Sequence, residues 1–225
     1  MHFEILVEGQ ADLVTLSILM PRLVGPYRCP HTWKIHKHRG IGKLPAEGDV
    51  GRVNRKDHSL LHTLPGKLKV YGERMREDEM VVVLVDLDDR PDCRIFKQEL
   101  VALLRHCPKQ PRCLFRIAVQ ELEAWFLGDT AALYSAYPHA RRAPLDACAQ
   151  GSQSGTWESL ADIIHPGSWS ALLAAGGRRG KRSCLVMDRK QEWAKRIAPH
   201  MDVECNRSPS FQCFRDGLRR FVPPV

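Results

Sequence analysis

The sequence lacks the short signatures that would place it in several common protein classes. Its eight Cys include no Cys-x-x-Cys pair, and the spacings of Cys107 with Cys113 and of Cys205 with Cys213 are not those of a structural zinc site. No apolar run approaches the roughly 20 residues that cross a bilayer. The N-terminal stretch MHFEILVEGQ carries acids instead of a basic leader. We therefore expect a cytoplasmic protein with free thiols and no membrane contact.

Two catalytic signatures are also missing. The chain has no G-x-x-x-x-G-K-S/T motif, so it is not expected to hydrolyse ATP by itself. It has no G-x-S-x-G elbow, which argues against a serine hydrolase. Any enzymatic activity is therefore expected to depend on other groups.

Positive charge is in excess. The 225 residues include 34 Lys and Arg against 26 Asp and Glu, a formal net charge of +8. This excess favours a polyanionic partner, and nucleic acid is the partner that it suggests. The length and a hydrophobic content of 44% are sufficient for a large globular core.

Apolar runs and amphipathic segments alternate along the first half of the chain. Strands are predicted at 3–7, 31–40, 81–85 and 113–119. Helices are predicted at about 11–23, at 95–107, after residue 120 and in LLHTLPGKLKVYGERM, where Pro65 interrupts or begins the helix. This order predicts an α/β fold with a mostly parallel central sheet flanked by helices.

The second half of the chain is predicted to be mostly helical. Residues 137–156 are rich in Pro, Gly, Ser and Ala, which predicts a surface excursion, and GGRRGKR (176–182) predicts a basic glycine loop. QEWAKRIAPHM and SPSFQCFRDGLRRFV predict helices, the second capped by Ser208 or Ser210. We predict an α/β core over residues 1–135 and a helical extension over 136–225, packed on the core or continuous with it.

Acidic residues follow three of the predicted strands. They are Glu8, then Asp86 with Asp88, then Glu121 with Glu123. In parallel α/β sheets ligands bind at the carboxyl ends of the strands, so these acids are expected at one edge. Carboxylates that lie close together need a cation or a shared proton. The sequence therefore predicts a site for Mg²⁺, or for Mn²⁺ in its place.

Other acids nearby have two interpretations. Asp12 lies one helical turn after Glu8, so it either joins the metal site or complements a helix N-terminus. Glu121 or Glu123 could likewise stabilise the start of the helix that follows. Asp89 and Asp92 are expected to be turn or helix-start residues. With Asp12 and one of the two Glu as ligands, two metal ions about 3.5–4 Å apart become feasible.

The motif ILVEG-x-x-D, followed much later by VVLVDLDD, resembles the TOPRIM fold. That fold is shared by primases, type IA and II topoisomerases and the overcome-lysogenisation-defect nucleases. The resemblance implies that Glu8, Asp86 and Asp88 bind Mg²⁺ and are catalytic. The chain lacks room for the additional domains of a topoisomerase or of a self-sufficient primase, so a nuclease is the expected member.

The nuclease branch of the TOPRIM fold implies further site residues. An acid one turn after the Glu fits Asp12, and Glu121 and Glu123 of VQELEAW are the candidates for a downstream acidic motif. The branch also uses a Lys, for which Lys190 or Lys181 is available.

The whole chain resembles a family of small bacterial TOPRIM-like proteins. The resemblance rests on VEGQAD, HKHRGIGKL, VDLDD, RIAVQELEAWFLGD, KQEWAKRIAPHMD and NRSPSFQCF. Members of that family are frequently encoded beside AAA-type or ABC-type ATPases. The resemblance therefore implies an ATPase partner and a role in anti-phage defence.

Two basic segments are candidate nucleic-acid contacts. HKHRGIGK supplies His36, His38, Arg39 and Lys43, and GGRRGKR supplies Arg178, Arg179, Lys181 and Arg182. Flexible backbone amides and cations suit phosphates. The alternative for each segment is a solvated surface loop.

These observations lead to one main hypothesis and one alternative. The main hypothesis is a Mg²⁺-dependent nuclease that cleaves DNA or RNA as the effector of an ATPase-containing defence system, with homo-oligomerisation left open. The alternative is a non-catalytic metal-binding or adaptor subunit that binds the ATPase.

Overall fold

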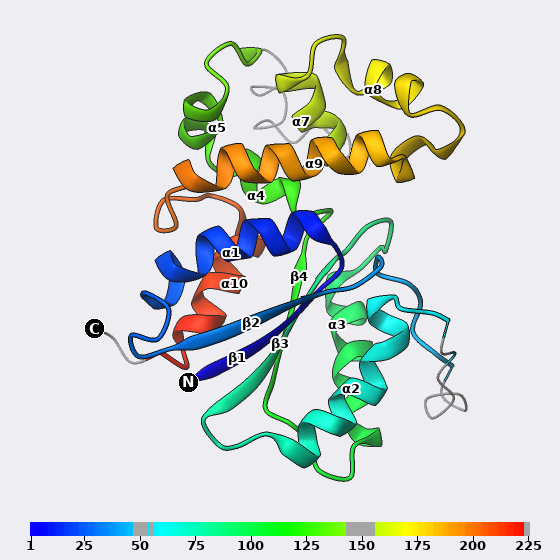
Figure 1. The fold of residues 1–225 in the computed structure, drawn as a ribbon, viewed down its shortest axis with the longest axis vertical. Coiled ribbons are helices and arrows are strands. Elements are labelled where there is room, and N and C mark those ends of the chain that lie inside the picture. The colour runs from blue at the N-terminus through cyan, green and yellow to red at the C-terminus, as the bar shows by residue number, and fades with distance from the viewer. Residues whose placement is uncertain (47–53, 55, 143–155, 223–225) are drawn as a thin grey trace.

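Four parallel strands form the centre of the molecule (Figure 1). The structure is a computed structural model and describes residues 1–46, 54, 56–142 and 156–222. The strands are β1 (His2–Val7), β2 (Thr32–Lys37), β3 (Glu79–Asp86) and β4 (Cys113–Ala118), in the order β2-β1-β3-β4. Each neighbouring pair is parallel. The predicted α/β fold with a parallel central sheet is confirmed.

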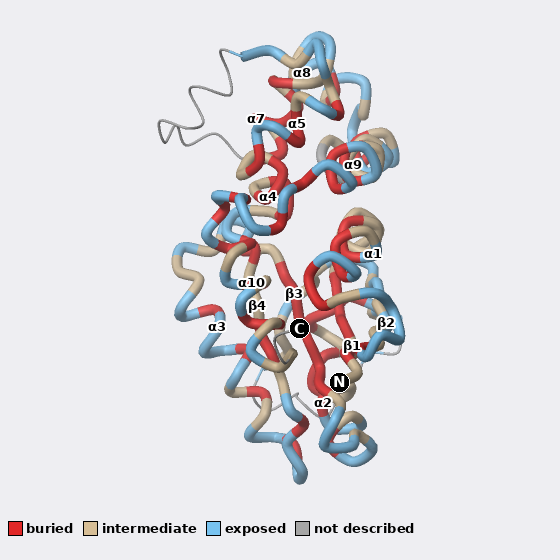
Figure 2. The backbone as a smooth tube through the Cα atoms, turned by 90° about the vertical axis from the view of Figure 1, so that its left-hand side faces the viewer, coloured by how far each residue is buried: buried red, intermediate tan, exposed pale blue. Residues whose placement is uncertain are grey.

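The sheet is buried on both faces, and this explains the continuous apolar run of β3. Met80, Val82 and Leu84 belong to one hydrophobic cluster, whereas Val81, Val83 and Val85 belong to a second cluster on the opposite face. Successive strand residues point to opposite faces, so a strand covered on both sides has no polar alternation. Figure 2 shows the buried backbone of the strands in the lower part of the molecule.

Helices cover the two faces. α1 (Gln10–Val24) and α10 (Pro209–Arg219) pack on one face, where Leu16, Leu19, Phe211 and Phe214 are fully buried. α2 (Leu60–Arg74), α3 (Cys93–Ala102) and the 3₁₀ turn η2 (Leu103–His106) cover the other face (Figure 1). Each fully buried Leu or Phe contributes about 1.5–3 kcal/mol.

Pro21 and Pro65 each lie inside an α-helix, at different positions along it. Pro21 lies in the last turn of α1. Pro65 neither begins nor interrupts α2, because the helix starts five residues earlier, at Leu60, and continues to Arg74. Pro65 is buried there, so packing offsets the lost backbone hydrogen bond.

A second layer of helices lies beyond α1 (Figure 1). It contains α4 (Glu123–Leu127), α5 (Thr130–Ala136), α7 (Thr156–Ile164), α8 (Ser168–Gly176), η3 (Gly177–Arg182), α9 (Cys184–Ile197) and η4 (Ala198–His200). Trp157 and Trp193 of this layer share one hydrophobic cluster with Phe3 of the sheet. A single core therefore crosses the boundary predicted at residue 135.

Two segments differ from the prediction or lie outside the described residues. GGRRGKR is not an irregular loop: most of it forms η3, which kinks where Gly180 has a positive φ of 49°. α9 begins at Cys184, before the predicted QEWAKRIAPHM, because Ser183 caps it by accepting a hydrogen bond from the Val186 N–H. Residues 143–155 of the predicted excursion lie outside the described part.

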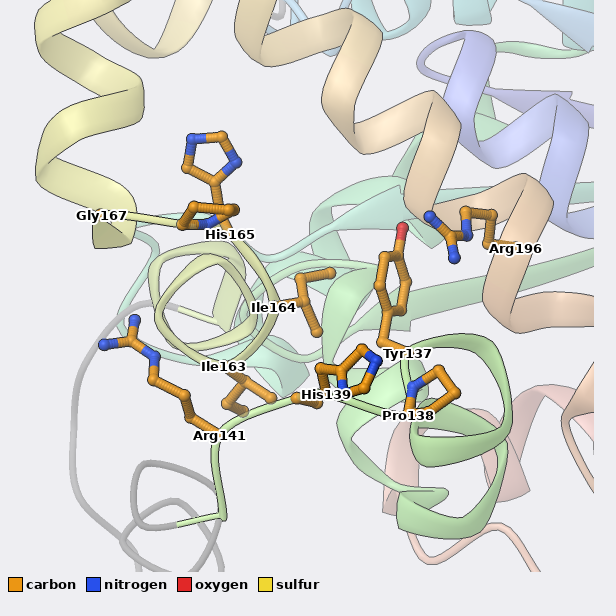
Figure 3. A pocket seen from close by; sticks show the side chains of 11 residues that line it. Tyr137, Pro138, His139, Arg141, Ile163, Ile164, His165, Gly167 and Arg196 are labelled. Carbon is orange, nitrogen blue, oxygen red and sulfur yellow. The ribbon is translucent and has the colours of Figure 1, made fainter.

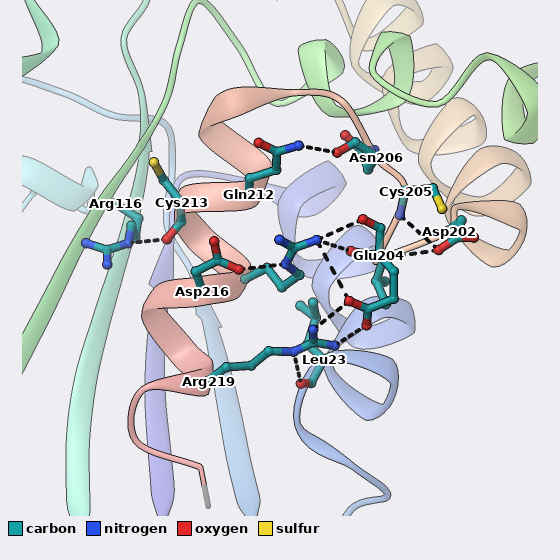
Figure 4. Close-up of polar contacts among 12 residues, drawn as sticks. Leu23, Arg116, Asp202, Glu204, Cys205, Asn206, Gln212, Cys213, Asp216 and Arg219 are labelled. Atoms are coloured by element: carbon teal, nitrogen blue, oxygen red, sulfur yellow. Dashed lines mark hydrogen bonds and ion pairs between the residues drawn. The ribbon is translucent and has the colours of Figure 1, made fainter. Parts of the chain in front are cut away.

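The C-terminal helix α10 is fixed by a network of polar contacts (Figure 4). Arg219 donates to both carboxylate oxygens of Glu204 at 2.8 and 2.6 Å, and Arg215 donates to the Glu204 carbonyl at 3.0 Å. Arg116 of β4 donates to the Cys213 carbonyl at 2.8 Å. Ser208 is the N-cap residue, although its side chain makes no capping hydrogen bond.

Among the described residues, no helix combines the length and apolar character needed to cross a membrane.

Candidate metal centre

The sheet order brings the three acid-bearing strand ends together. β1, β3 and β4 are consecutive neighbours and run parallel, so Glu8, Asp86 and Glu121 follow strands that end at the same edge. The pairing extends past the last strand residues, because Leu87 N–H donates to the Ala118 carbonyl and Asp88 N–H to the Gln120 carbonyl, each at 2.9 Å. This edge is the place where open α/β sheets bind ligands.

Glu8 and Asp86 are in direct contact, although 78 residues separate them. One carboxylate oxygen of Glu8, Oε1, accepts the backbone N–H of Asp86 at 2.7 Å. Burial, together with the negative charge of Asp12, raises the pKa of Glu8 well above its usual value. Burial and the charges of Glu8 and Asp12 likewise raise the pKa of Asp86. The two carboxyl groups are therefore costly to ionise together without a cation.

Asp12 stabilises a helix start, as one of its two predicted roles stated, and its role as a metal ligand stays a prediction. It lies in the first turn of α1, and its Oδ2 accepts the Gly9 N–H at 2.8 Å, which stabilises the helix start. It also belongs electrostatically to the cluster, since its charge acts on Glu8 and Asp86. Burial is the largest cause that raises the pKa of Asp12 to about 6.

Glu121 and Glu123 meet a lysine from the helical layer. Nζ of Lys190, on α9, lies 3.3 Å from Oε2 of Glu121 and 3.3 Å from Oε1 of Glu123. Burial, partly opposed by Lys190, raises the pKa of Glu121 to about 7. Burial disfavours the charge of Lys190, but the carboxylates of Glu123 and Glu121 raise its pKa above the usual value. Lys190 therefore stays protonated and acts as a fixed positive charge.

Asp88 has a different environment from Asp86. Its positive φ of 50° breaks the extended backbone after Asp86, so the two carboxylates do not follow the alternation of a regular strand. Its side chain is 39% exposed and lies 3.8 Å from Arg90. Its charge still raises the pKa of Glu8. Asp92, as predicted, is a helix-start residue: it caps α3 by accepting the N–H groups of Arg94 and Ile95.

The donor set suits a divalent cation, although the side chains do not converge as they stand. Within the described ranges, no three His, Cys, Asp or Glu side chains are arranged to hold one ion. The residue types are nevertheless those that Mg²⁺ takes. Burial is the largest cause of the raised pKa values of Glu8, Asp12 and Asp86, and neighbouring carboxylates add to it. A bound cation would favour the ionised forms.

The HKHRGIGK segment lies beside this edge. The N–H of Gly40 donates to the Glu8 carbonyl at 3.0 Å, while the carbonyls of Gly40 and Ile41 accept the N–H groups of Leu60 and Leu61 at the start of α2. The segment thus satisfies orphan donors of a helix N-terminus. Gly40 and Gly42 have positive φ values of 84° and 70°, which explains why glycine occupies both turns.

The basic side chains of that segment differ in their contacts: the two histidines contact other protein groups, whereas Arg39 and Lys43 are exposed. His36 contacts the Glu4 carboxylate, and Nδ1 of His38 lies 2.8 Å from the Val7 carbonyl. Burial lowers the pKa of His38, so it is neutral at pH 7.

The second basic segment leads into the helix that carries Lys190. Arg178 is exposed in η3, directly before α9. The side chains of Arg179, Lys181 and Arg182 lie outside the part that the structure describes.

A pocket lies away from the acidic edge (Figure 3). It encloses about 330 Å³ between the end of α5, the end of α7 and Arg196 of α9. Tyr137, His139, Arg141 and His165 contribute to its lining, and no residue of the acidic cluster does. The guanidinium of Arg196 is 4.1 Å from the centre of the Tyr137 ring.

One cation at the edge was missed by the sequence interpretation. Arg90 directly follows the acidic run in VDLDDR, and its charge opposes a small part of the rise that burial and the neighbouring carboxylates cause in the pKa of Glu8. Its position directly after the carboxylates is the sequence signal that points to it.

The chain belongs to a family described as a domain of unknown function, DUF4276, whose model matches residues 7–219. Neither the curated proteins nor the solved structures contain a match to this chain.

Proposed function

We propose that this member of the DUF4276 family is a metal-dependent nuclease of the TOPRIM type that hydrolyses DNA or RNA with Mg²⁺ or Mn²⁺. The observation that carries the proposal is the contact between Glu8 and Asp86 at neighbouring strand ends. It unites the two halves of the motif that resembles TOPRIM domains.

In this proposal the carboxylates divide into two groups. Glu8, Asp86 and Asp88 hold the principal metal ion, and Asp12 with Glu121 or Glu123 holds a second ion. The bound metal supplies positive charge that stabilises the negative oxygens of a phosphodiester as it is hydrolysed.

Lys190 contributes charge and position. Because its pKa is raised, it does not serve as a general base at neutral pH. It holds Glu121 and Glu123 in place through its 3.3 Å contacts and offers a positive charge to a departing oxygen. Arg39, Lys43 and Arg178, all exposed, attract the nucleic-acid backbone.

The biological setting is the effector subunit of an ATPase-containing anti-phage system. Support comes from the resemblance to proteins encoded beside AAA-type or ABC-type ATPases. Size-exclusion chromatography of the protein with an ATPase encoded beside its gene tests this part, and separate elution under conditions that preserve both proteins contradicts it.

A second candidate is a non-catalytic adaptor that binds metal or the ATPase. The observation that favours it is that Lys190 already neutralises part of the acidic cluster. An adaptor would bind its partner without cleaving nucleic acid.

Cleavage assays distinguish the two candidates. Purified protein is incubated with plasmid DNA and with tRNA in the presence of Mg²⁺, Mn²⁺ or EDTA, with and without the ATPase. We expect metal-dependent cleavage that Asp86→Asn reduces by about 10³-fold or more, because loss of metal charge costs several kcal/mol in the transition state.

The matched control is Asp89→Asn. Asp89 is an exposed carboxylate three residues after Asp86, and its removal changes the net charge equally. Wild-type and Asp89→Asn proteins are expected to cleave alike. Metal binding by the wild-type protein without cleavage under any condition supports the adaptor instead.

A further inference from the structure

Arg90 is held rigidly at the edge of the acidic cluster by its own loop. Its backbone N–H donates to the Leu87 carbonyl at 3.2 Å, and Nη1 of its side chain lies 3.3 Å from the same oxygen. Its guanidinium is 4.1 Å from the centre of the ring of Phe96, which is 2% exposed. Stacking on a buried ring fixes the plane of the guanidinium and reduces the freedom that it would lose on binding.

The position of this cation relative to the carboxylates is specific. Nη1 of Arg90 lies 3.8 Å from Oδ2 of Asp88, and the positive charge of Arg90 acts on Glu8. Lys190 acts instead on Asp12 and Asp86. The two cations thus act on different carboxylates of the cluster.

Arg90 retains hydrogen-bonding capacity. Its side chain is 29% exposed, and in the part of the chain that the structure describes only Nη1 makes a hydrogen bond. An arginine has five N–H donors in one plane, so Nε and Nη2 remain to bind a ligand. Phosphate oxygens match this planar arrangement in a way that a lysine ammonium does not.

We propose that Arg90 binds a backbone phosphate of the nucleic-acid substrate and aligns it with the acidic cluster. The inference rests on the proposed function and adds to it a substrate-binding residue whose guanidinium is fixed before the substrate arrives. Without such a cation, the carboxylates of this edge would repel the polyanion.

The test compares Arg90→Gln and Arg90→Lys with the matched control Arg94→Gln. Arg94 is exposed in the first turn of α3, four residues away, and its substitution removes the same charge from the same surface. Affinity for a single oligonucleotide is measured at several salt concentrations, together with KM and kcat. Mg²⁺ affinity is measured by calorimetry, and thermal melting shows that each variant is folded.

We expect Arg90→Gln to weaken oligonucleotide binding by about tenfold or more, the loss typical of a charge-assisted hydrogen bond. The slope of log affinity against log salt should fall by about one, because one phosphate contact is lost. Arg90→Lys should recover the slope but only part of the affinity. Mg²⁺ affinity should change little.

The outcomes separate this inference from the proposed function. Equal salt slopes for wild-type protein and Arg90→Gln overturn the role of Arg90 even if the protein is a nuclease. Nucleic-acid binding without cleavage, with a slope that Arg90→Gln reduces, retains the phosphate contact and overturns the nuclease. Absence of any nucleic-acid binding by the wild-type protein overturns both.

Discussion

Two polar regions of this molecule contain similar side chains but handle charge in opposite ways. Around α10, Glu204 is bound by Arg219 through both carboxylate oxygens and approached by Arg215 (Figure 4). At the carboxyl edge of the sheet, by contrast, Glu8, Asp12 and Asp86 lie close together and share the influence of Lys190 and Arg90.

The pKa values record the difference. Hydrogen bonds from Arg219 lower the pKa of Glu204, whereas burial raises the pKa values of Glu8 and Asp86. A network that only holds the fold together gains from matched charges. A cluster whose acids are costly to ionise is more typical of a site that needs those acids for another purpose.

The largest effect on stability is expected from Lys190→Met. This substitution removes the main cation of the acidic edge and so increases its difference from the α10 network, where each charge has a partner. Glu121 and Glu123 would then be buried without their positive partner. Breaking a buried ion pair on one side costs about 3–5 kcal/mol. Urea denaturation measures this loss, and Lys195→Met, an exposed position on the same helix, is the control.

A loss no larger for Lys190→Met than for Lys195→Met would show that the pair contributes little. The double variant Lys190→Met with Glu123→Gln should recover part of the stability, since it removes one stranded charge together with its partner.

The next effect concerns pH. In the folded protein the pKa values of Asp12 and Glu121 are about 6 and about 7, against usual values of 3.8 and 4.5. Between these limits the folded state binds more protons than the unfolded chain, so stability falls as pH rises from about 4 to about 7. Glu204 acts in the opposite sense, because its lowered pKa costs stability only as the pH falls below its usual value of 4.5.

Urea denaturation in EDTA at several pH values measures this dependence. Saturating Mg²⁺ should flatten the decline, since the metal binds the ionised carboxylates. The prediction is contradicted if the free energy of unfolding in EDTA rises with pH over the same range. The carboxylates of the acidic edge would then be neutralised as fully as Glu204 in the α10 network.

The smallest expected effect is on the stability of the metal-free protein, which Glu204→Gln should lower and Glu8→Gln should raise. Glu204→Gln removes a surface ion pair and should destabilise the protein by about 0.2–1 kcal/mol. Glu8→Gln retains an oxygen that can accept the Asp86 N–H but removes a repelled charge, so it should raise the melting temperature of the metal-free protein. Thermal melting in EDTA measures both changes. If both variants shifted the melting temperature in the same direction, the acidic edge and the α10 network would not differ in how they neutralise charge.

Much of the fold could be predicted from local patterns. The Val81–Val85 run and the strands on either side of it specify a buried parallel sheet, because only such a sheet removes polar alternation. The extent of α2 could not be predicted, because Pro65 signals an interruption that tertiary packing overrides. The start of α9 was missed because the capping Ser183 follows a Gly-rich and basic stretch.

The candidate site was only partly accessible from sequence. The rule that strand ends carry the site identified Glu8, Asp86 and Glu121, and the strand order brings their strands side by side. The change of backbone conformation after Asp86 depends on the positive φ of Asp88, which the spacing of the two residues does not reveal. The contacts of Lys190 depend on where α9 packs, and the sequence offered only its residue type.

The origin of Lys190 outside the sheet has a consequence for dissecting the protein. A chain truncated after residue 135 would keep every carboxylate of the edge but lose its lysine, along with α9, α10 and the aromatic residues that belong to the same hydrophobic cluster as Phe3. Such a fragment would combine unshielded repulsion with an exposed apolar surface. The smallest fragment that folds stably should therefore extend at least through α10, and a partner that displaced α9 would remove the charge of Lys190 from the strand ends.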